Sequence, residues 1–262
     1  MPSLDTLPGP AANDPGSPRL VLPGREQRAG AGVDWVAEGW QLFRKAPLMW
    51  IVILVLLILV NVALGMLPWV GKLLTTLVAP IIAGGVAAGC RSLETGGELE
   101  LDHLLAGFRR NTGMLFAIGV VYVLGQMALL GIFAMFVGWS LVWAALTSGA
   151  GVMAAMTGSI LAVATGGLVV AALAVPLFAA IWFAPTLAML HDQPAMPAMK
   201  ESLMACLRNW LPMLVYGLVM FALLAAAVIP LGLGLLVWIP MLFTTNYAGY
   251  RGIFTEPDAQ AA

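Results

Sequence analysis

Charge is scarce in this chain. Only 10% of its 262 residues are Asp, Glu, Lys or Arg, whereas 61% are hydrophobic, and the mean hydropathy is +0.96. A soluble domain usually carries about a quarter charged residues. A chain with so few polar side chains cannot cover its surface with groups that water solvates, so lipid has to be its solvent. The composition therefore predicts an integral membrane protein.

Other absences exclude functions. Between residues 111 and 190 the sequence contains no Asp, Glu, Lys, Arg or His. Ion-coupled transporters use ionisable groups inside the membrane, so this argues against coupled transport, although not against a passive pore. The net charge of −1, without a basic stripe, argues against a nucleic-acid partner. No phosphate loop, dinucleotide fingerprint or nucleophile elbow occurs in a suitable context, and we expect no cofactor.

Cysteine and histidine are also rare. Cys90 and Cys206 belong to no CxxC pair, and no neighbouring motif supplies a base that would activate either thiol. The two histidines each adjoin an aspartate, at Asp102-His103 and at His191-Asp192. If these loops met, they could offer His and carboxylate ligands to a metal. Their spacing matches no known zinc motif, so we expect no metal site.

Six apolar runs are long enough to cross a bilayer, whose apolar core of about 30 Å needs roughly 20 helical residues. We place the spans near residues 48–67, 73–90, 114–137, 160–190, 211–228 and 231–248. Pro176 and Pro185 are expected to kink or end the fourth. Residues 1–32 and 255–262 have the composition of tails without fixed structure. The predicted fold is therefore an all-α membrane domain over residues 33–254.

The basic residues predict the orientation of the spans. In a six-span topology, eleven of the 12 Lys and Arg fall on one side and only Lys72 on the other. The positive-inside rule makes the first side cytoplasmic and places both termini inside a bacterial inner membrane. The uncharged stretch 138–159 could be an exported loop, a re-entrant segment or a seventh span. A seventh span would move Lys200, Arg208 and Arg251 outside, so we favour a loop or re-entrant segment.

The sequence contains a threefold pattern. Ahead of the first, third and fifth spans, an apolar residue is followed by Arg, then by small or polar residues, then by the start of the span. An amphipathic stretch precedes each motif, and helices of this kind lie in the plane of the membrane interface with the apolar row in the lipid. We therefore predict three units, each a cytoplasmic interfacial helix followed by a membrane hairpin. The apolar rows are Val33, Val36, Trp40 and Phe43; Leu101, Leu104, Leu105 and Phe108; and Met199, Leu203, Cys206 or Leu207, and Trp210.

Four runs of this sequence resemble a known family. They are residues 39–47, 106–111, 206–212 and 247–254. They are similar to an uncharacterised bacterial family of six-span inner-membrane proteins, and the similarity covers about residues 33–254. Because that family has no assigned activity, the resemblance implies a location and a fold but no chemistry. The repeat is also loosely similar to the membrane domain fused to some glycerophosphodiester phosphodiesterases, whose catalytic domain we do not find in this sequence.

Five basic residues mark the starts of the spans on the predicted cytoplasmic side: Arg44, Lys45, Arg109, Arg110 and Arg208. Basic side chains near a membrane surface attract anionic lipid headgroups, with about 1 kcal/mol for each residue. The same residues also set the topology, and the two roles are compatible. We predict that this basic ring does both.

Asn61 and Gln126 are the clearest polar amides inside spans. They could line a path for a substrate, or they could form hydrogen bonds between helices, worth around 1 kcal/mol or less, and we favour the second role. The second span also has a face of small residues, which lets another backbone approach closely. That face would serve dimerisation or packing within the chain, and we favour the latter: its residues are Gly84, Gly85, Ala88 and Gly89.

These features favour a non-enzymatic inner-membrane protein that acts as a scaffold, an assembly factor or a lipid-interacting protein. Its partners would be the bilayer with anionic phospholipids, and a membrane-protein partner or a second copy. The alternative is a channel or uncoupled transporter for a small or apolar solute that uses Asn61 and Gln126. An enzyme acting on lipids ranks third. A hydrated cavity lined by the two amides would favour transport, and a dry helix bundle would favour the scaffold.

Overall fold

The computed structural model describes residues 19–67, 69–146 and 152–256, and in these residues the chain forms helices and no β-strand beyond one isolated bridge. The prediction of an all-α membrane protein is confirmed. The helices are α1 (Ala31–Lys45), α2 (Pro47–Gly65), α3 (Val70–Glu94), α4 (Asp102–Arg109), α5 (Thr112–Leu146), α6 (Val152–Trp182), α7 (Ala184–His191), α8 (Ala195–Arg208), α9 (Trp210–Val228) and α10 (Leu235–Phe254).

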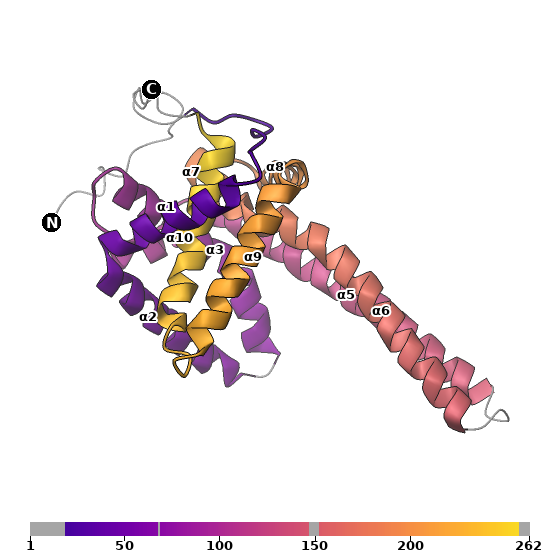
Figure 1. Ribbon diagram of the computed structural model, residues 1–262. Helices are drawn as coiled ribbons and strands as arrows, with labels where there is room; N and C mark the ends of the chain where they lie inside the picture. The colour runs from indigo at the N-terminus through magenta and orange to yellow at the C-terminus, as the bar shows by residue number, and fades with distance from the viewer. Residues whose placement is uncertain (1–18, 68, 147–151, 257–262) are drawn as a thin grey trace.

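The order of the helices follows the predicted units. Three short helices, α1, α4 and α8, are each followed by two long ones, and α7 is an additional short helix after α6. Figure 1 shows α1, α7 and α8 gathered at one end of the bundle, from which α2, α3, α9 and α10 run away side by side. The short helices therefore form a layer across the end of the long ones.

Five helical stretches of the described chain are long and apolar enough to cross a membrane. They are α2, α3, Thr112–Ser140 of α5, Ile160–His191 of α6 and α7, and α9. The stretch predicted as a sixth span lies mostly in α10, which is 20 residues long but is polar in its second half, with Thr244, Thr245 and Asn246. The count of six spans stays a prediction.

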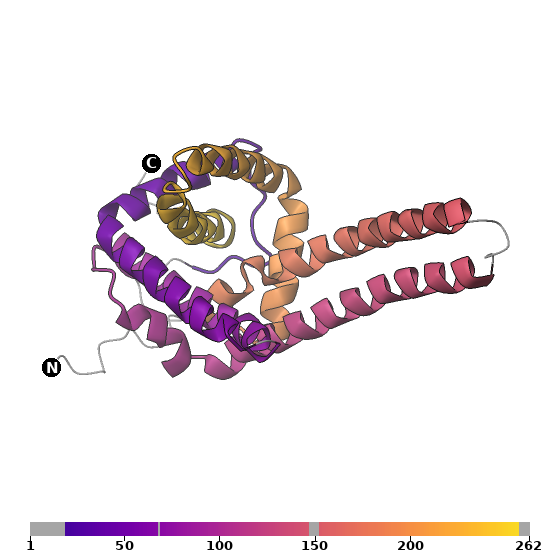
Figure 2. The ribbon, with the colours of Figure 1, turned by 90° about the horizontal axis from the view of Figure 1, so that it is seen from below.

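Helices α5 and α6 form a long antiparallel hairpin that leaves the bundle. At 1.5 Å per residue, the 35 residues of α5 extend about 50 Å, well beyond the thickness of a bilayer core. Figure 2 shows the hairpin projecting sideways from the other helices. A span of this length fits a bilayer only when it tilts or when its ends protrude. Figure 1 shows the hairpin running at an angle to α9 and α10.

The stretch 138–159 is helical where the structure describes it. Residues up to Leu146 continue α5, and residues from Val152 begin α6, while 147–151 lie outside the described residues. The prediction of a loop was therefore wrong for the described residues of this stretch, which are helical, and no separate helix among them forms a seventh span. The position of the stretch relative to the membrane stays a prediction. Ala, Leu and Met favour helix, and a backbone in apolar surroundings must satisfy its hydrogen bonds internally.

Helix α6 ends close to one of the two prolines that were expected to kink or end this span. Pro176 lies inside α6, whereas the helix breaks at Phe183, two residues before Pro185. A proline lacks a backbone N–H and disfavours helix in the residue before it, so a break next to Pro185 is expected. After the break, α7 continues as a short buried helix and ends at Asp192 in the left-handed conformation (φ 52°).

Residues 19–30, which composition predicts to belong to a tail, are held against the bundle. The backbone N–H of Val21 donates to the carbonyl of Phe254 (2.8 Å), and that of Arg25 to the carbonyl of Ile253 (2.8 Å). Asn209 accepts from the N–H of Gln27 (2.8 Å). The last carbonyls of a helix have no partner within it, and this segment supplies donors to the end of α10. Residues 1–18 and 257–262 lie outside the described residues.

Candidate functional site

Helix α1 packs its apolar residues against protein rather than exposing them all to lipid. Trp35 is 3% exposed and Phe43 4% exposed. A Cβ added to Gly39 would lie 2.4 Å from the Cγ2 of Thr245, so α1 crosses α10 in close contact. Trp40 of the predicted lipid-facing row remains 41% exposed. The predicted row therefore splits, with one part on the bundle and the other outside.

The same split occurs in α4 and α8. In α4, Leu104 is buried while Leu105 and Phe108 stay exposed. In α8, Met199 is buried while Leu207 just before the end of the helix stays exposed. Each short helix thus uses one row to fix itself to the bundle and keeps a second apolar row on the outside. An amphipathic sequence predicts an apolar row but does not distinguish a lipid contact from a protein contact.

Two residues of the predicted basic ring are engaged in ion pairs. Arg109 pairs with Asp102 (2.7 Å) within α4, and both side chains are about half exposed. Arg110 pairs with Asp192 (3.2 Å), and the amide of Asn111 also donates to Asp192 (2.5 Å). The second pair links the start of α5 to the end of α7. Both pairs therefore serve the structure of the chain.

The other three residues of the ring are less engaged. The Nζ of Lys45 donates to the carbonyl of Leu93 (2.7 Å). Arg44 and Arg208 are exposed and make no hydrogen bond or ion pair with the described part of the chain. Each lies beside an exposed tryptophan: Trp40 is one helical turn before Arg44, and Trp210, which is 63% exposed, is two residues after Arg208.

A charged cluster that the sequence did not reveal joins α1, α3 and α10. Arg251 near the end of α10 donates to Glu38 of α1 (2.7 Å) and to Glu94 of α3. The hydroxyl of Tyr247 donates to the other oxygen of Glu94 (2.5 Å). One guanidinium thus bridges two carboxylates from distant parts of the sequence. Residues 247–254 form one of the four runs that resemble the known family. Nothing in that run predicted that Arg251 would contact Glu38 and Glu94.

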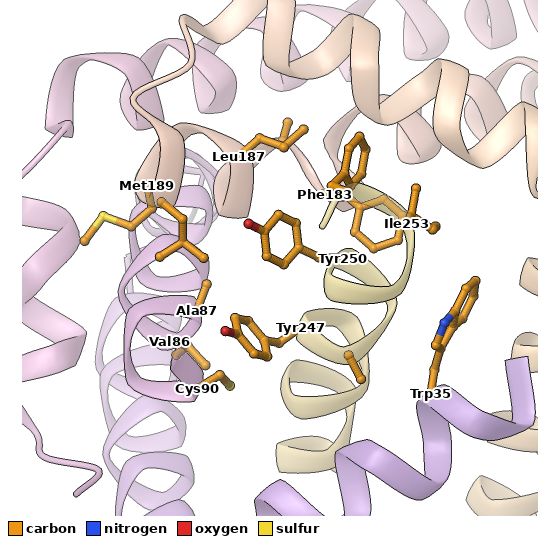
Figure 3. Packing of buried hydrophobic residues seen from close by; sticks show 14 of the residues in the cluster. Trp35, Val86, Ala87, Cys90, Phe183, Leu187, Met189, Tyr247, Tyr250 and Ile253 are labelled. Carbon is orange, nitrogen blue, oxygen red and sulfur yellow. The ribbon is translucent and has the colours of Figure 1, made fainter. Parts of the chain in front are cut away.

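Two tyrosines of α10 reach into the centre of the molecule. Figure 3 shows Tyr247 and Tyr250 extending from α10 toward α3 and α7, with Trp35 of α1 on the opposite side of α10. The hydroxyl of Tyr250 forms a hydrogen bond with His191 at the end of α7. Apolar contacts and a few polar links therefore hold α10 between α1, α3 and α7.

The structure does not bring Asn61 and Gln126 together. Asn61 donates to the carbonyl of Leu57 in its own helix (2.9 Å) and lines a groove between α2 and α10. Gln126 lines a separate groove between α5 and α6, which includes Gly167. Gln126 makes no hydrogen bond with the described residues. The geometry therefore provides no shared polar path that contains both amides.

The small-residue face of α3 is in contact with other helices of the same chain. A Cβ on Gly84 would lie 3.1 Å from the Cδ2 of Leu115, and a Cβ on Gly85 would lie 2.4 Å from the carbonyl oxygen of His103. Gly89 is buried on the same face, and Ala88 is partly buried. Helices α4 and α5 occupy this face, so it is not free for a partner in this structure.

The histidines and cysteines are separated. His103 bonds to the backbone of Glu100, whereas His191 bonds to Tyr250. In the described residues there is no group of three His, Cys, Asp or Glu side chains that could hold a metal ion. Burial raises the pKa of the Cys206 thiol to about 12, so the group stays protonated at neutral pH.

Comparison with known proteins identifies a relative. A probable inner membrane protein of Burkholderia thailandensis is 32% identical over 257 residues, which cover 89% of this chain and 95% of the relative. No family model matches the chain. No solved structure matches it either. The likeness to the membrane domain of glycerophosphodiester phosphodiesterases stays a prediction. The near-complete overlap and the apolar helices show that the chain belongs to this family of multi-pass proteins of the bacterial inner membrane, to which no function has been assigned.

Proposed function

We propose that this protein is a non-enzymatic, lipid-interacting protein of the inner membrane. It binds anionic phospholipid headgroups at its short-helix end, the end of the bundle where α1, α7 and α8 gather. One observation carries the proposal. The two arginines of the basic ring that make no ion pair within the described residues, Arg44 and Arg208, each lie beside an exposed tryptophan. The two arginines occupy corresponding positions of the first and third units, whereas Trp40 precedes Arg44 by four residues and Trp210 follows Arg208 by two.

The physical basis is the chemistry of the membrane interface. Tryptophan favours the headgroup level of a bilayer, where its ring is partly apolar and its N–H is hydrated. An arginine at the same depth meets the phosphates of anionic lipids, and each such contact contributes about 1 kcal/mol. A guanidinium that is already paired with a carboxylate gains less free energy from a contact with a lipid phosphate. Arg44 and Arg208 are therefore the residues of the ring best suited to hold a headgroup.

The orientation is part of the proposal. The short-helix end would face the cytoplasm, because it carries the basic residues, while Lys72 lies near the start of α3 at the other end. The absence of enzymatic activity is proposed as well, and the protonated, buried thiol of Cys206 supports it. The transport alternative gains no support from Asn61 and Gln126, which line different grooves.

The test compares two double variants that remove the same charge. Arg44→Gln/Arg208→Gln removes the unpaired arginines, whereas Arg28→Gln/Arg109→Gln removes arginines paired with Asp34 and Asp102. Each protein is purified in detergent and titrated with phosphatidylglycerol, and bound lipid is counted by native mass spectrometry. We expect the first variant to lose about tenfold in affinity, which corresponds to two contacts of about 1 kcal/mol with partial compensation.

The control decides the specificity of the effect. Arg28→Gln/Arg109→Gln should bind phosphatidylglycerol within about twofold of the unmodified protein, because surface ion pairs contribute little and their arginines are already satisfied. Equal losses in the two variants would mean that only total charge matters. No loss in the first variant would reject the proposed headgroup sites.

A further inference from the structure

A cavity of about 570 Å³ lies at the root of the α5–α6 hairpin. Its walls come from α3, α7, α9 and α10 and from the last turns of α6, for example Val86, Trp182 and Phe243. Its volume falls within the roughly 300–1,000 Å³ of typical small-ligand pockets. The cavity thus has the size of a binding site, and it forms where the hairpin leaves the bundle.

The cavity opens on a face that candidate membrane spans form. Two of its lining residues, Phe178 of α6 and Gly217 of α9, are exposed on helices that are candidate membrane spans. Figure 1 shows α6 diverging from α9 as both run away from α7 and α8. A ligand would therefore enter sideways from the lipid, while α7 lies against the inner end of the cavity.

The lining excludes charged ligands. Of the described residues that line the cavity, none is Asp, Glu, Lys, Arg or His, and most are aliphatic or aromatic. An ionised group has no counter-charge there, and burying an unpaired charge in apolar surroundings is strongly unfavourable. An apolar chain, in contrast, gains stability for each methylene that it buries.

The polar atoms of the lining that make no hydrogen bond with the described residues include the hydroxyl of Thr186 and the Oδ1 of Asn246. The hydroxyl of Thr186 belongs to a residue that is 3% exposed and makes no hydrogen bond with the described part of the chain. The Nδ2 of Asn246 donates to the carbonyl of Trp182 (2.9 Å), where α6 ends, and this bond fixes the side chain. The Oδ1 of Asn246 accepts no hydrogen bond from the described residues. A donor and an acceptor therefore remain available in an apolar cavity.

We infer that this cavity binds the chain of a neutral lipid whose polar end is a free hydroxyl, such as a mono- or diacylglycerol or a long-chain alcohol. A hydroxyl both donates and accepts, so it can donate to the Oδ1 of Asn246 and accept from the hydroxyl of Thr186. The apolar chain fills the space between α6, α9 and α10. This site is separate from Arg44 and Arg208, and its ligand differs from the anionic lipids proposed to bind there.

Photolabelling of the full chain in nanodiscs of phosphatidylethanolamine and phosphatidylglycerol tests the inference. One probe is a long-chain alcohol with a diazirine in its chain, and the other is the alkyl sulfate of the same chain. Cross-linked peptides are identified by mass spectrometry. We expect the alcohol to label peptides of α6, α9 and α10 that line the cavity, and the sulfate to label them at least tenfold less, because its charge cannot enter.

Three variants locate the site. Gly217→Leu adds a side chain to the mouth of the cavity, and nothing lies within 4 Å of the Cβ position at Gly217. Gly131→Leu is the matched control on the hairpin, where the Cβ position is equally open. Thr186→Val removes one hydroxyl at nearly constant shape. We expect Gly217→Leu to reduce labelling of the lining about tenfold and Thr186→Val about fivefold, the latter equivalent to one net hydrogen bond, and Gly131→Leu to leave it unchanged.

The following outcomes would contradict the inference. Equal labelling of the lining by the alcohol and the sulfate would overturn the choice of a neutral ligand. Equal labelling in Gly217→Leu and Gly131→Leu, or labelling confined to other peptides, would overturn the site. The Arg44→Gln/Arg208→Gln variant should keep the cavity labelling, so a failure of either proposal is recognisable without the other.

Discussion

Helix α3 and the α5–α6 hairpin have similar hydropathy but opposite surroundings. In the apolar window of α3, 44% of residues are buried within the chain, whereas in the windows of α5 and of Ile160–His191 the shares are 0% and 6%. The hydropathies of these windows are 1.9, 2.2 and 2.4. A strongly apolar sequence therefore predicts that a helix is shielded from water, but it does not predict whether protein or lipid covers the helix.

The two regions differ in the contacts that their glycines make and in the charged contacts at the ends of their helices. In α3, Gly84 lies against α5 and Gly85 and Gly89 lie against α4, while Gly131, Gly138 and Gly167 of the hairpin have nothing within 4 Å of a Cβ position. The C-terminal end of α3 also carries Glu94, which Arg251 and Tyr247 bind. Close packing against several helices and a charged link hold α3 in the bundle, whereas the described outer part of the hairpin packs α5 only against α6, as at Gly166, whose Cβ position lies 2.8 Å from the Cβ of Phe136.

The largest expected effect comes from enlarging a glycine in each region. In Gly85→Leu, the added Cβ would lie 2.4 Å from the carbonyl oxygen of His103, a backbone atom that cannot move without shifting α4. We expect a loss of about 3 kcal/mol in the free energy of unfolding, measured by SDS titration in mixed micelles. Gly131→Leu should change it by less than about 0.5 kcal/mol. Similar losses in both variants would contradict the contrast in packing between α3 and the hairpin.

An intermediate effect is expected from the charged cluster. Arg251→Met leaves Glu38 and Glu94 facing each other without their shared cation, and α1, α3 and α10 lose their common link. Because these side chains are partly exposed, we expect a loss of about 1–2 kcal/mol in the free energy of unfolding.

The matched control for this cluster is Arg28→Met, which removes an exposed pair with Asp34. It should cost at most about 0.5 kcal/mol, since surface ion pairs contribute little. A loss as small in Arg251→Met as in Arg28→Met would show that the cluster does not hold the bundle together.

The smallest effect is expected for Gln126→Leu in the hairpin. Gln126 makes no hydrogen bond with the described residues, so its removal breaks no contact within the chain. We expect a change within about 0.5 kcal/mol in the free energy of unfolding. A marked destabilisation would mean that Gln126 has a partner, such as a second copy of the chain, and the unmodified protein would then sediment as an oligomer in detergent.

Several parts of the site follow from sequence and several do not. The basic ring was recognisable because Arg and Lys gather at the starts of spans, yet its division into paired and unpaired members depends on Asp102 and Asp192, whose positions come from the fold. The cavity had no signature in the sequence. Thr186 of α7 and Asn246 of α10 are far apart in the sequence, and only the packing of the two helices brings both side chains to the same cavity.

The sequence alone determined that this chain is an all-α protein of the membrane and that short amphipathic helices precede its pairs of long helices. Those features depend on local hydropathy and periodicity, which any segment carries by itself. Only the tertiary structure decided that the stretch 138–159 is largely helical, that the apolar rows of α1, α4 and α8 split between bundle and surroundings, and that Arg251 joins Glu38 to Glu94. These depend on which helices meet, and contacts between residues more than a hundred positions apart leave no periodic pattern in one sequence.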